Sequence, residues 1–255
     1  MQKRVEVIDL DNPSKTCILS AEFPKKLFHA TGGFTSSGPM VCGGFYDWRW
    51  SDSSKDCYSL RNNGQFVKIS ELDTPRGEAS SIVTANGKLI ISGGLNKNEG
   101  LLYDTEIINV TESKTEEGFV LPKEISEYCS VLINATTMMV LGGRNASSSA
   151  QKSTYFIDLD TFQVTVGPEM QETRGRFGCA VFEHNQQNFL IAAGGSPPDV
   201  RDSIEFLSLD STRLRWSKGK IPFSGLGQKK YQIYFSFNFQ DLHCLFKWLS
   251  FRLFH

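Results

Sequence analysis

Residues 40–44 read MVCGG, a short apolar run that ends in two glycines. The same pattern returns as IISGG at 90–94, MVLGG at 139–143 and IAAGG at 191–195. The first glycines of the four pairs are separated by 50, 49 and 52 residues. Four copies at so even a period indicate a repeat protein. The glycines of this repeat are Gly43, Gly44, Gly93, Gly94, Gly142, Gly143, Gly194 and Gly195.

The composition favours many short strands and excludes some classes of partner. Within 255 residues there are 22 glycines, and runs of Val, Ile, Phe and Tyr alternate with Ser, Thr and Asn. The net charge of −1 argues against a broad surface for nucleic acid or anionic membrane, because such a surface needs clustered basic residues. No apolar run approaches the length of about 18 residues that a membrane helix needs. The N-terminal residues 1–15 lack the apolar core of a signal peptide, which predicts a cytoplasmic chain unless the sequence is a fragment of a secreted protein.

Each period can be divided into four strands. A short first strand is followed by a turn and by the apolar second strand that ends in Gly-Gly. A loop then leads to a third strand, and a weaker fourth strand closes the unit. The first strands are expected at 79–85, 129–135 and 178–184, the third at 56–60, 104–110, 153–159 and 202–209, and the fourth at 65–69, 118–121, 162–166 and 214–218.

These units predict an all-β protein, a β-propeller of four-stranded antiparallel blades. One such sheet cannot cover its own apolar faces, and packing successive sheets around an axis solves this while leaving only short edges. The glycine pair suits that geometry, because a residue without Cβ lets the chain kink and lets a neighbouring sheet approach closely.

The sequence resembles the kelch-repeat family. The resemblance rests on the apolar Gly-Gly ending, the period near 50, an Arg ahead of the first strand at Arg76 and Arg174, and a Trp in the fourth strand at Trp216. It has some likeness to extracellular invertebrate kelch domains. It implies a partial blade (third and fourth strands) at 1–26, four repeats within 27–227 (27–74, 75–125, 126–173 and 174–222) and an atypical tail at 228–255.

The two ends leave the number of blades open. Kelch rings often close by pairing strands from both termini in one blade, and the tail has runs of β character that could complete the N-terminal half-blade. The ring would then have five blades. Alternatively the aromatic-rich tail, which has no Gly-Gly, is not kelch sequence, and the chain is a truncated six-bladed ring.

Two pairs of cysteines have different expected roles. Cys42 ends a second strand and Cys57 opens the third strand beside it, so their thiols could lie at disulfide distance. The alternative is that both are small buried residues with free thiols. The resemblance implies the disulfide, because such cysteines pair in the extracellular kelch domains that the chain resembles. Cys129 and Cys179 hold equivalent first-strand positions in successive units, and we expect them to serve packing.

Three sequons for N-glycosylation are present, at Asn109, Asn134 and Asn145. Asn134 is expected in a hairpin turn and Asn145 in the loop after Gly-Gly, where a glycan could be carried. These sequons favour a secreted protein.

No catalytic motif is found. The four histidines lie far apart in the sequence, and none has a neighbouring ligand at metal spacing. There is no nucleophile elbow, phosphate-binding glycine loop or zinc-protease motif. Some kelch-like propellers are enzymes, galactose oxidase among them, but nothing here matches its copper ligands. We therefore expect no catalysis, metal or cofactor.

Partner binding is expected on the loops between second and third strands, because loops on a rigid scaffold carry recognition. The most informative is 45–55, FYDWRWSDSSK, since Trp, Tyr and Arg dominate binding hot spots. Arg76 and Arg174 are expected to be structural. The candidate binding residues are Tyr46, Trp48, Arg49, Trp50, Asn96, Asn98, Arg144 and Arg201.

The sequence therefore predicts a non-catalytic module that binds a protein or peptide through the loops of a kelch propeller. One form of this hypothesis is an extracellular recognition domain, favoured by the cysteines and sequons. The alternatives are the substrate-recognition part of a ubiquitin-ligase adaptor and, less favoured, a propeller oxidase.

Overall fold

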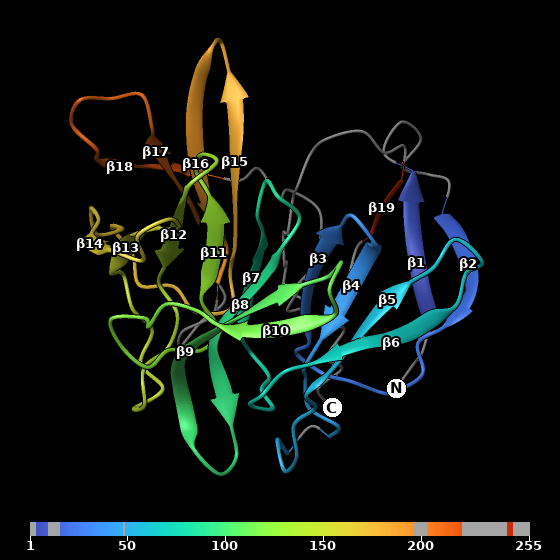
Figure 1. Cartoon of the computed structure of the whole chain (residues 1–255). Coiled ribbons are helices and arrows are strands. Elements are labelled where there is room, and N and C mark those ends of the chain that lie inside the picture. Colours follow the sequence, from blue (N-terminus) through green and yellow to red (C-terminus); the bar gives the residue numbers. More distant parts are fainter. Residues whose placement is uncertain (1–3, 10–15, 48, 196–202, 221–243, 247–255) are drawn as a thin grey trace, which may run out of the picture.

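The computed structural model describes residues 4–9, 16–47, 49–195, 203–220 and 244–246. Its architecture is all-β, as the sequence predicts. Four antiparallel sheets of four strands each follow one another along the chain in a propeller-like arrangement, and we call them blades 1 to 4 (Figure 1). A further sheet has the order β19-β1-β2.

The strands of blades 1 and 2 are β3 (Thr31–Thr35), β4 (Gly38–Cys42), β5 (Asp56–Leu60), β6 (Phe66–Glu71), β7 (Ser80–Val83), β8 (Leu89–Asn96), β9 (Gly100–Asn109) and β10 (Lys114–Glu117). Those of blades 3 and 4 are β11 (Cys129–Leu132), β12 (Thr137–Leu141), β13 (Thr154–Asp158), β14 (Val164–Val166), β15 (Gly178–His184), β16 (Gln187–Ala193), β17 (Ser203–Ser208) and β18 (Trp216–Lys220). The further sheet contains β1 (Arg4–Asp9), β2 (Thr16–Glu22) and β19 (Cys244–Phe246).

The first strands of successive blades lie side by side, β3 beside β7, β7 beside β11 and β11 beside β15. Hydroxyl groups join them: Thr31 Oγ1 lies 2.6 Å from Ser81 Oγ, and Ser80 Oγ lies 2.7 Å from Ser130 Oγ. The first strand is therefore the inner strand of each blade.

The core consists of apolar layers between neighbouring blades. The layer between blades 2 and 3 contains Ile90 and Ile107 from one side and Met138 and Ile157 from the other. Similar layers lie between blades 1 and 2 and between blades 3 and 4, the latter with the buried Trp216, whose Nε1 donates to Pro168 O at 2.9 Å. Blades 2 and 3 each bury both faces in this way, which a single sheet could not do alone.

The glycine pairs are required by the joint between blades. In blade 2, Gly93 and Gly94 have φ values of +55° and +100°. A Cβ on Gly94 would lie 2.6 Å from Gly77 O, and the Gly94 N–H donates to Ile125 O, at the entry to blade 3, at 2.9 Å. Only glycine combines this backbone with this proximity.

One expected strand is corrected. The fourth strand of blade 2 is Lys114–Glu117, not 118–121. The apolar Phe119 and Leu121 that suggested the later strand are buried in the layer between blades 2 and 3, whereas the polar residues 114–117 pair with β9 at the outer edge.

Of the tail expected at 228–255, only β19 is described, and it pairs antiparallel with β1. The rest of the tail lies outside the described residues.

In the part of the chain that the structure describes, four of the cysteines form two disulfides. Cys42 and Cys57 are bonded within blade 1, where their Cα atoms face each other 4.1 Å apart, which confirms the disulfide expected there. The packing role expected for Cys129 and Cys179 is wrong, because they are bonded to each other with Cα atoms 6.0 Å apart. Cys129 is the first residue of β11 and Cys179 the second residue of β15, and these inner strands lie side by side.

Candidate functional site

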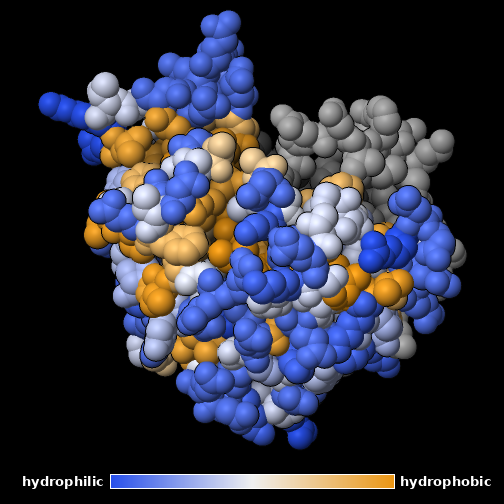
Figure 2. All heavy atoms as spheres, in the orientation of Figure 1, coloured by the Kyte–Doolittle hydropathy of each residue, from blue (hydrophilic) through white to orange (hydrophobic). Residues whose placement is uncertain are grey.

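The loops between second and third strands and the entries to the first strands lie at the same end of the blades. In blades 1 to 3 the residue three positions before the first strand pairs with the one after the glycine pair, as Phe28 does with Phe45, Gly77 with Leu95 and Ser126 with Arg144. We call this end the loop face. In Figure 1 it lies toward the bottom, and in Figure 2 the same region is mostly hydrophilic.

Four equivalent residues meet at the loop face beside the inner strands. His29, Glu78, Glu127 and Arg176 recur every 49 residues, one in each blade. All four have left-handed backbones, with φ between 52° and 55°. Each N–H donates to the carbonyl of the equivalent residue one blade earlier, at 3.0, 3.0 and 2.8 Å for residues 78, 127 and 176. Non-glycine residues rarely adopt this conformation, and such residues gather at functional sites.

Their side chains, with Arg144, form one charged group that we call the central cluster. Arg176 of blade 4 reaches Glu78 of blade 2, with Nη2 3.4 Å from Oε1, and also pairs with Glu127 of blade 3. Arg144 Nε donates to Glu127 Oε2 at 2.6 Å. His29 Nε2 lies 3.9 Å from Glu78 Oε1. Side chains from all four blades therefore converge on two carboxyl groups.

The carboxyl groups are buried, whereas the guanidinium groups reach the surface. The side chains of both Glu78 and Glu127 are 3% exposed, while those of Arg144 and Arg176 are 21% and 17% exposed. Burial, together with the nearby Glu127 carboxylate, raises the pKa of Glu78 to about 8, although Arg176 opposes the shift. The cluster thus combines a proton-binding carboxyl with two cations that face solvent.

The loop at 45–55 is held by its own hydrogen bonds. Asp47 Oδ1 accepts the N–H groups of Arg49 and Ser51 at 2.9 and 3.1 Å. Hydrogen bonds from Ser51 and from the Arg49 N–H lower the pKa of Asp47. Tyr46 Oη accepts from Lys25 Nζ at 3.1 Å, so the Tyr46 side chain is fixed as well.

Of the two tryptophans in this loop, Trp50 is described and Trp48 lies outside the described residues. The Trp50 ring is half-buried, with its centroid 6.4 Å from that of Phe45. Its Nε1 is buried and has no hydrogen-bond partner among the described residues. Arg49 is exposed. The loop therefore offers an ordered, partly apolar surface with an exposed cation.

The other candidate binding residues have different settings. Asn96 is buried: its Nδ2 donates to Pro75 O at 2.8 Å and its Oδ1 accepts from the Asn98 N–H, so both polar atoms of its side chain stabilise the blade. Asn98 is exposed on the loop face, and Arg144 belongs to the central cluster. Arg201 lies outside the described residues.

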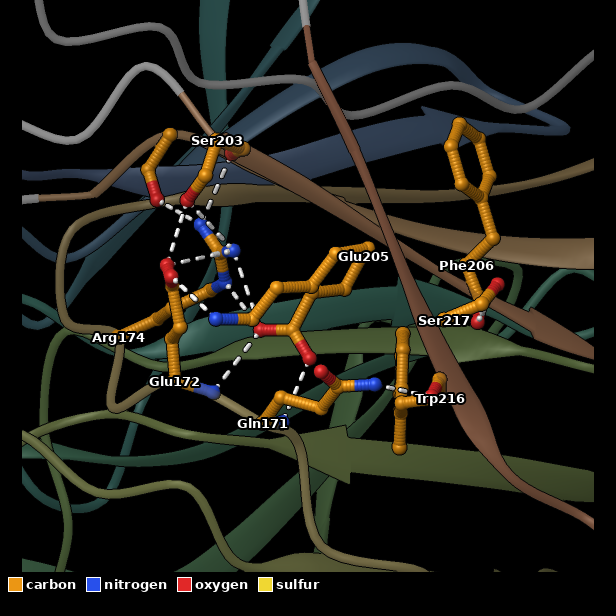
Figure 3. Close-up of polar contacts among 10 residues, drawn as sticks. Gln171, Glu172, Arg174, Ser203, Glu205, Phe206, Trp216 and Ser217 are labelled. Atoms are coloured by element: carbon orange, nitrogen blue, oxygen red, sulfur yellow. Dashed lines mark hydrogen bonds and ion pairs between the residues drawn. The ribbon is translucent and has the colours of Figure 1, made fainter.

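Arg76 and Arg174 are structural, as expected. Both are fully buried, and each joins the entry to its blade with the glycine pair and third strand. Figure 3 shows Arg174 bonding to Glu205 Oε1 at 3.1 Å and to Ser203, while Glu205 also accepts the N–H groups of Gln171 and Glu172. Arg76 makes the same kind of contact with Gly93 O and Glu106 in blade 2.

The central cluster was missed by sequence reasoning, although a signal for it exists. Glu78 and Arg176 each lie two residues after the structural arginines Arg76 and Arg174. Comparing the repeats position by position, rather than by their glycines alone, would have placed four polar residues at one end of the inner strands.

Within the described ranges, no group of three or more His, Cys, Asp or Glu side chains has a geometry that could hold a metal ion. The part of the chain that the structure describes contains no helix long and apolar enough to cross a membrane.

Comparison with protein families gives no match, and comparison with curated proteins also gives none. Among solved structures, the chain is similar to the structure of YjhT, with a TM-score of 0.63 and 16% sequence identity over 79% of this chain and 67% of that chain. At this identity the likeness shows the fold alone. It agrees with the propeller-like arrangement of four-stranded sheets found here.

Proposed function

We propose that this protein is a non-catalytic kelch-type interaction module that binds a peptide segment or protein surface through its loop face. The observation that carries this proposal is that the central cluster and the hydrogen-bonded loop 45–55 lie at the same end of the four blades. A preformed surface of this kind binds with little rearrangement, because its side chains are already fixed.

The disulfides favour an extracellular setting over a cytosolic ubiquitin-ligase adaptor. Cys42 and Cys57 are fully buried, and Cys129 and Cys179 are nearly so. Structural disulfides form and persist in oxidising compartments and are rare in the cytosol. We therefore place the module outside the cell or in the secretory pathway.

The test is a selection from a displayed library of random peptides with the full chain as bait, followed by calorimetry on the enriched peptides. The variant Trp48→Ala with Arg49→Ala removes an aromatic and a cationic residue from the sequence of loop 45–55. Arg61→Ala with Phe162→Ala is the matched control, because these residues lie on turns at the opposite end of blades 1 and 3.

We expect the loop variant to weaken binding by roughly 30-fold or more, a loss of about 2 kcal/mol in binding free energy that is typical of hot-spot residues. The control variant should bind like the wild type. Both variants must keep the wild-type melting temperature to within about 2 °C, the shift expected for less than about 1 kcal/mol in a protein of this size. Equal binding by the loop variant and the wild type would overturn the proposal.

A further inference from the structure

The three sequons occupy different surroundings in the fold. Asn134 lies at the tip of the hairpin between β11 and β12, and residues 134–136 are all exposed. Asn109, at the end of β9, and Asn145, in the loop between β12 and β13, are half-buried. Of the three, Asn134 is thus the one whose surroundings leave most room for a large substituent.

The side chain of Asn134 uses one of its two polar atoms to stabilise the turn. Its Oδ1 accepts the N–H groups of Thr136 and Thr137 at 3.0 and 2.7 Å, and the Thr136 hydroxyl lies 3.4 Å away. Its Nδ2 makes no hydrogen bond within the described ranges. An N-linked sugar keeps the amide carbonyl, so substitution at Nδ2 leaves these turn contacts in place.

The backbone of the hairpin also tolerates a bulky group at this position. The Ile133 N–H donates to Thr137 O at 2.9 Å and closes the turn beneath the exposed tip. The pairing of β11 with β12 begins below this point, at Leu132 and Met138. A substituent on Asn134 would therefore extend into solvent without displacing either strand.

We propose that Asn134 carries an N-linked glycan, an inference that rests on the extracellular setting proposed above. In the transfer, Nδ2 of Asn134 forms a bond to C1 of an oligosaccharide on a lipid pyrophosphate. The bond from C1 to the pyrophosphate oxygen breaks, the lipid pyrophosphate leaves, and the nitrogen loses one proton. The sequon Asn134-Ala135-Thr136 is the acceptor for this reaction.

The position of the glycan leaves the loop face open. Turns between first and second strands lie at the end of the blades opposite the loops between second and third strands, toward the top of Figure 1. A glycan on Asn134 shields that opposite end, and the partner has access to the central cluster and to loop 45–55. Glycosylation and binding therefore occupy opposite ends of the molecule.

The test is expression of the full chain behind a secretion signal in a eukaryotic cell, with glycopeptide mass spectrometry before and after enzymatic release of N-glycans in heavy-oxygen water. We expect the peptide with Asn134 to carry the glycan and, after release, an aspartate labelled with heavy oxygen. Thr136→Ala should abolish this modification, whereas Thr136→Ser should retain it. Asn185, in the equivalent β15–β16 turn but followed by Gln186-Gln187, is the internal control and should stay unmodified.

An unmodified Asn134 in secreted protein that contains both disulfides would overturn the inference and leave the proposed binding function intact. Peptide binding by protein freed of its glycan should equal that of the glycosylated form. If the selection yields no peptide but Asn134 is glycosylated, the binding function fails and the glycan inference stands. The same mass comparison on protein recovered from its native source with an antibody decides whether the site is used there.

Discussion

The disulfide between Cys129 and Cys179 joins two blades, and its removal gives a prediction of known size. The variant Cys129→Ser with Cys179→Ser places hydroxyls where the neighbouring inner strands already carry the hydrogen-bonded pair Ser80 and Ser130. It therefore replaces the covalent link with the contact that another pair of blades uses at the equivalent place.

The magnitude follows from the length of chain that the bond encloses. The cysteines are 50 residues apart, and for a loop of that length the chain-entropy relation gives about 4 kcal/mol of stabilisation. A hydroxyl hydrogen bond in its place contributes about 1 kcal/mol. We expect the variant to lose about 3 kcal/mol in the free energy of unfolding, a fall in Tm of roughly 6–12 °C for a protein of this size.

The assay is urea unfolding of wild type and variant without reductant, followed by fluorescence and far-UV circular dichroism. Because the lost link is the one between blades 3 and 4, fluorescence of the buried Trp216 should change before the circular dichroism does. The variant Cys42→Ser with Cys57→Ser is the comparison: its cysteines are 15 residues apart within one blade, so it should lose about 3 kcal/mol without separating the two signals.

Equal unfolding midpoints for the wild type and the Cys129→Ser, Cys179→Ser variant would refute this reasoning. So would peptide mapping of unreduced protein that finds no linked pair of peptides containing these two cysteines. Either result would also remove the main support for an oxidising compartment.

Three further predictions concern single side chains. The pKa of Glu78 is raised to about 8 in the folded protein, so the folded state holds this proton more tightly than the unfolded state does. The resulting stability is fully present below the ordinary pKa of a glutamate and is lost as the pH rises toward 8. Between these pH values, Glu78 should lower the free energy of unfolding by up to about 1.4 kcal/mol per pH unit. Urea titrations at a series of pH values measure this decline. The variant Glu78→Gln should flatten it, whereas Glu124→Gln, at an exposed position, should not. Arg174→Ala leaves Glu205 buried without its cation and should lower the free energy of unfolding by about 3–5 kcal/mol. Thermal unfolding measures this loss, with Arg213→Ala at an exposed position as the control. A loss below about 1 kcal/mol would show that the buried network is not structural. Gly94→Ala should lower the free energy of unfolding more than Gly64→Ala does. Gly94 has φ +100° and its added Cβ would lie 2.6 Å from Gly77 O, whereas Gly64 has φ +79° and nothing within 4 Å, so only the backbone cost of about 1–2 kcal/mol applies there. Equal losses would contradict the close-approach explanation.

The sequence was sufficient for the all-β, propeller-like architecture because the feature that sets the period is local. Each glycine pair ends a strand at a fixed place in its blade, so an even spacing in the chain becomes an even succession of sheets. The Cys42–Cys57 disulfide was accessible for the same reason, since both residues belong to neighbouring strands of one blade.

What the sequence did not yield depends on contacts between blades. Cys129 and Cys179 meet only because β11 and β15 lie side by side, a relation that hydrophobic patterning inside one repeat does not contain. Glu78 and Arg176 lie 98 residues apart and meet across the inner strands. Asn96 resembled a binding residue because it follows a glycine pair, but a strand extended by two residues buries it against Pro75.

The central claim is that the loop face binds a partner, and hydrogen–deuterium exchange with a library-selected peptide tests it most directly. The account predicts that the bound peptide slows exchange at residues 44–55 and at the entries to the inner strands, near Glu78, Glu127 and Arg176. The turns at the opposite end, at 84–88 and 133–137, should exchange at the same rate with and without peptide. Slowed exchange at those turns, with none at the loop face, would contradict the account.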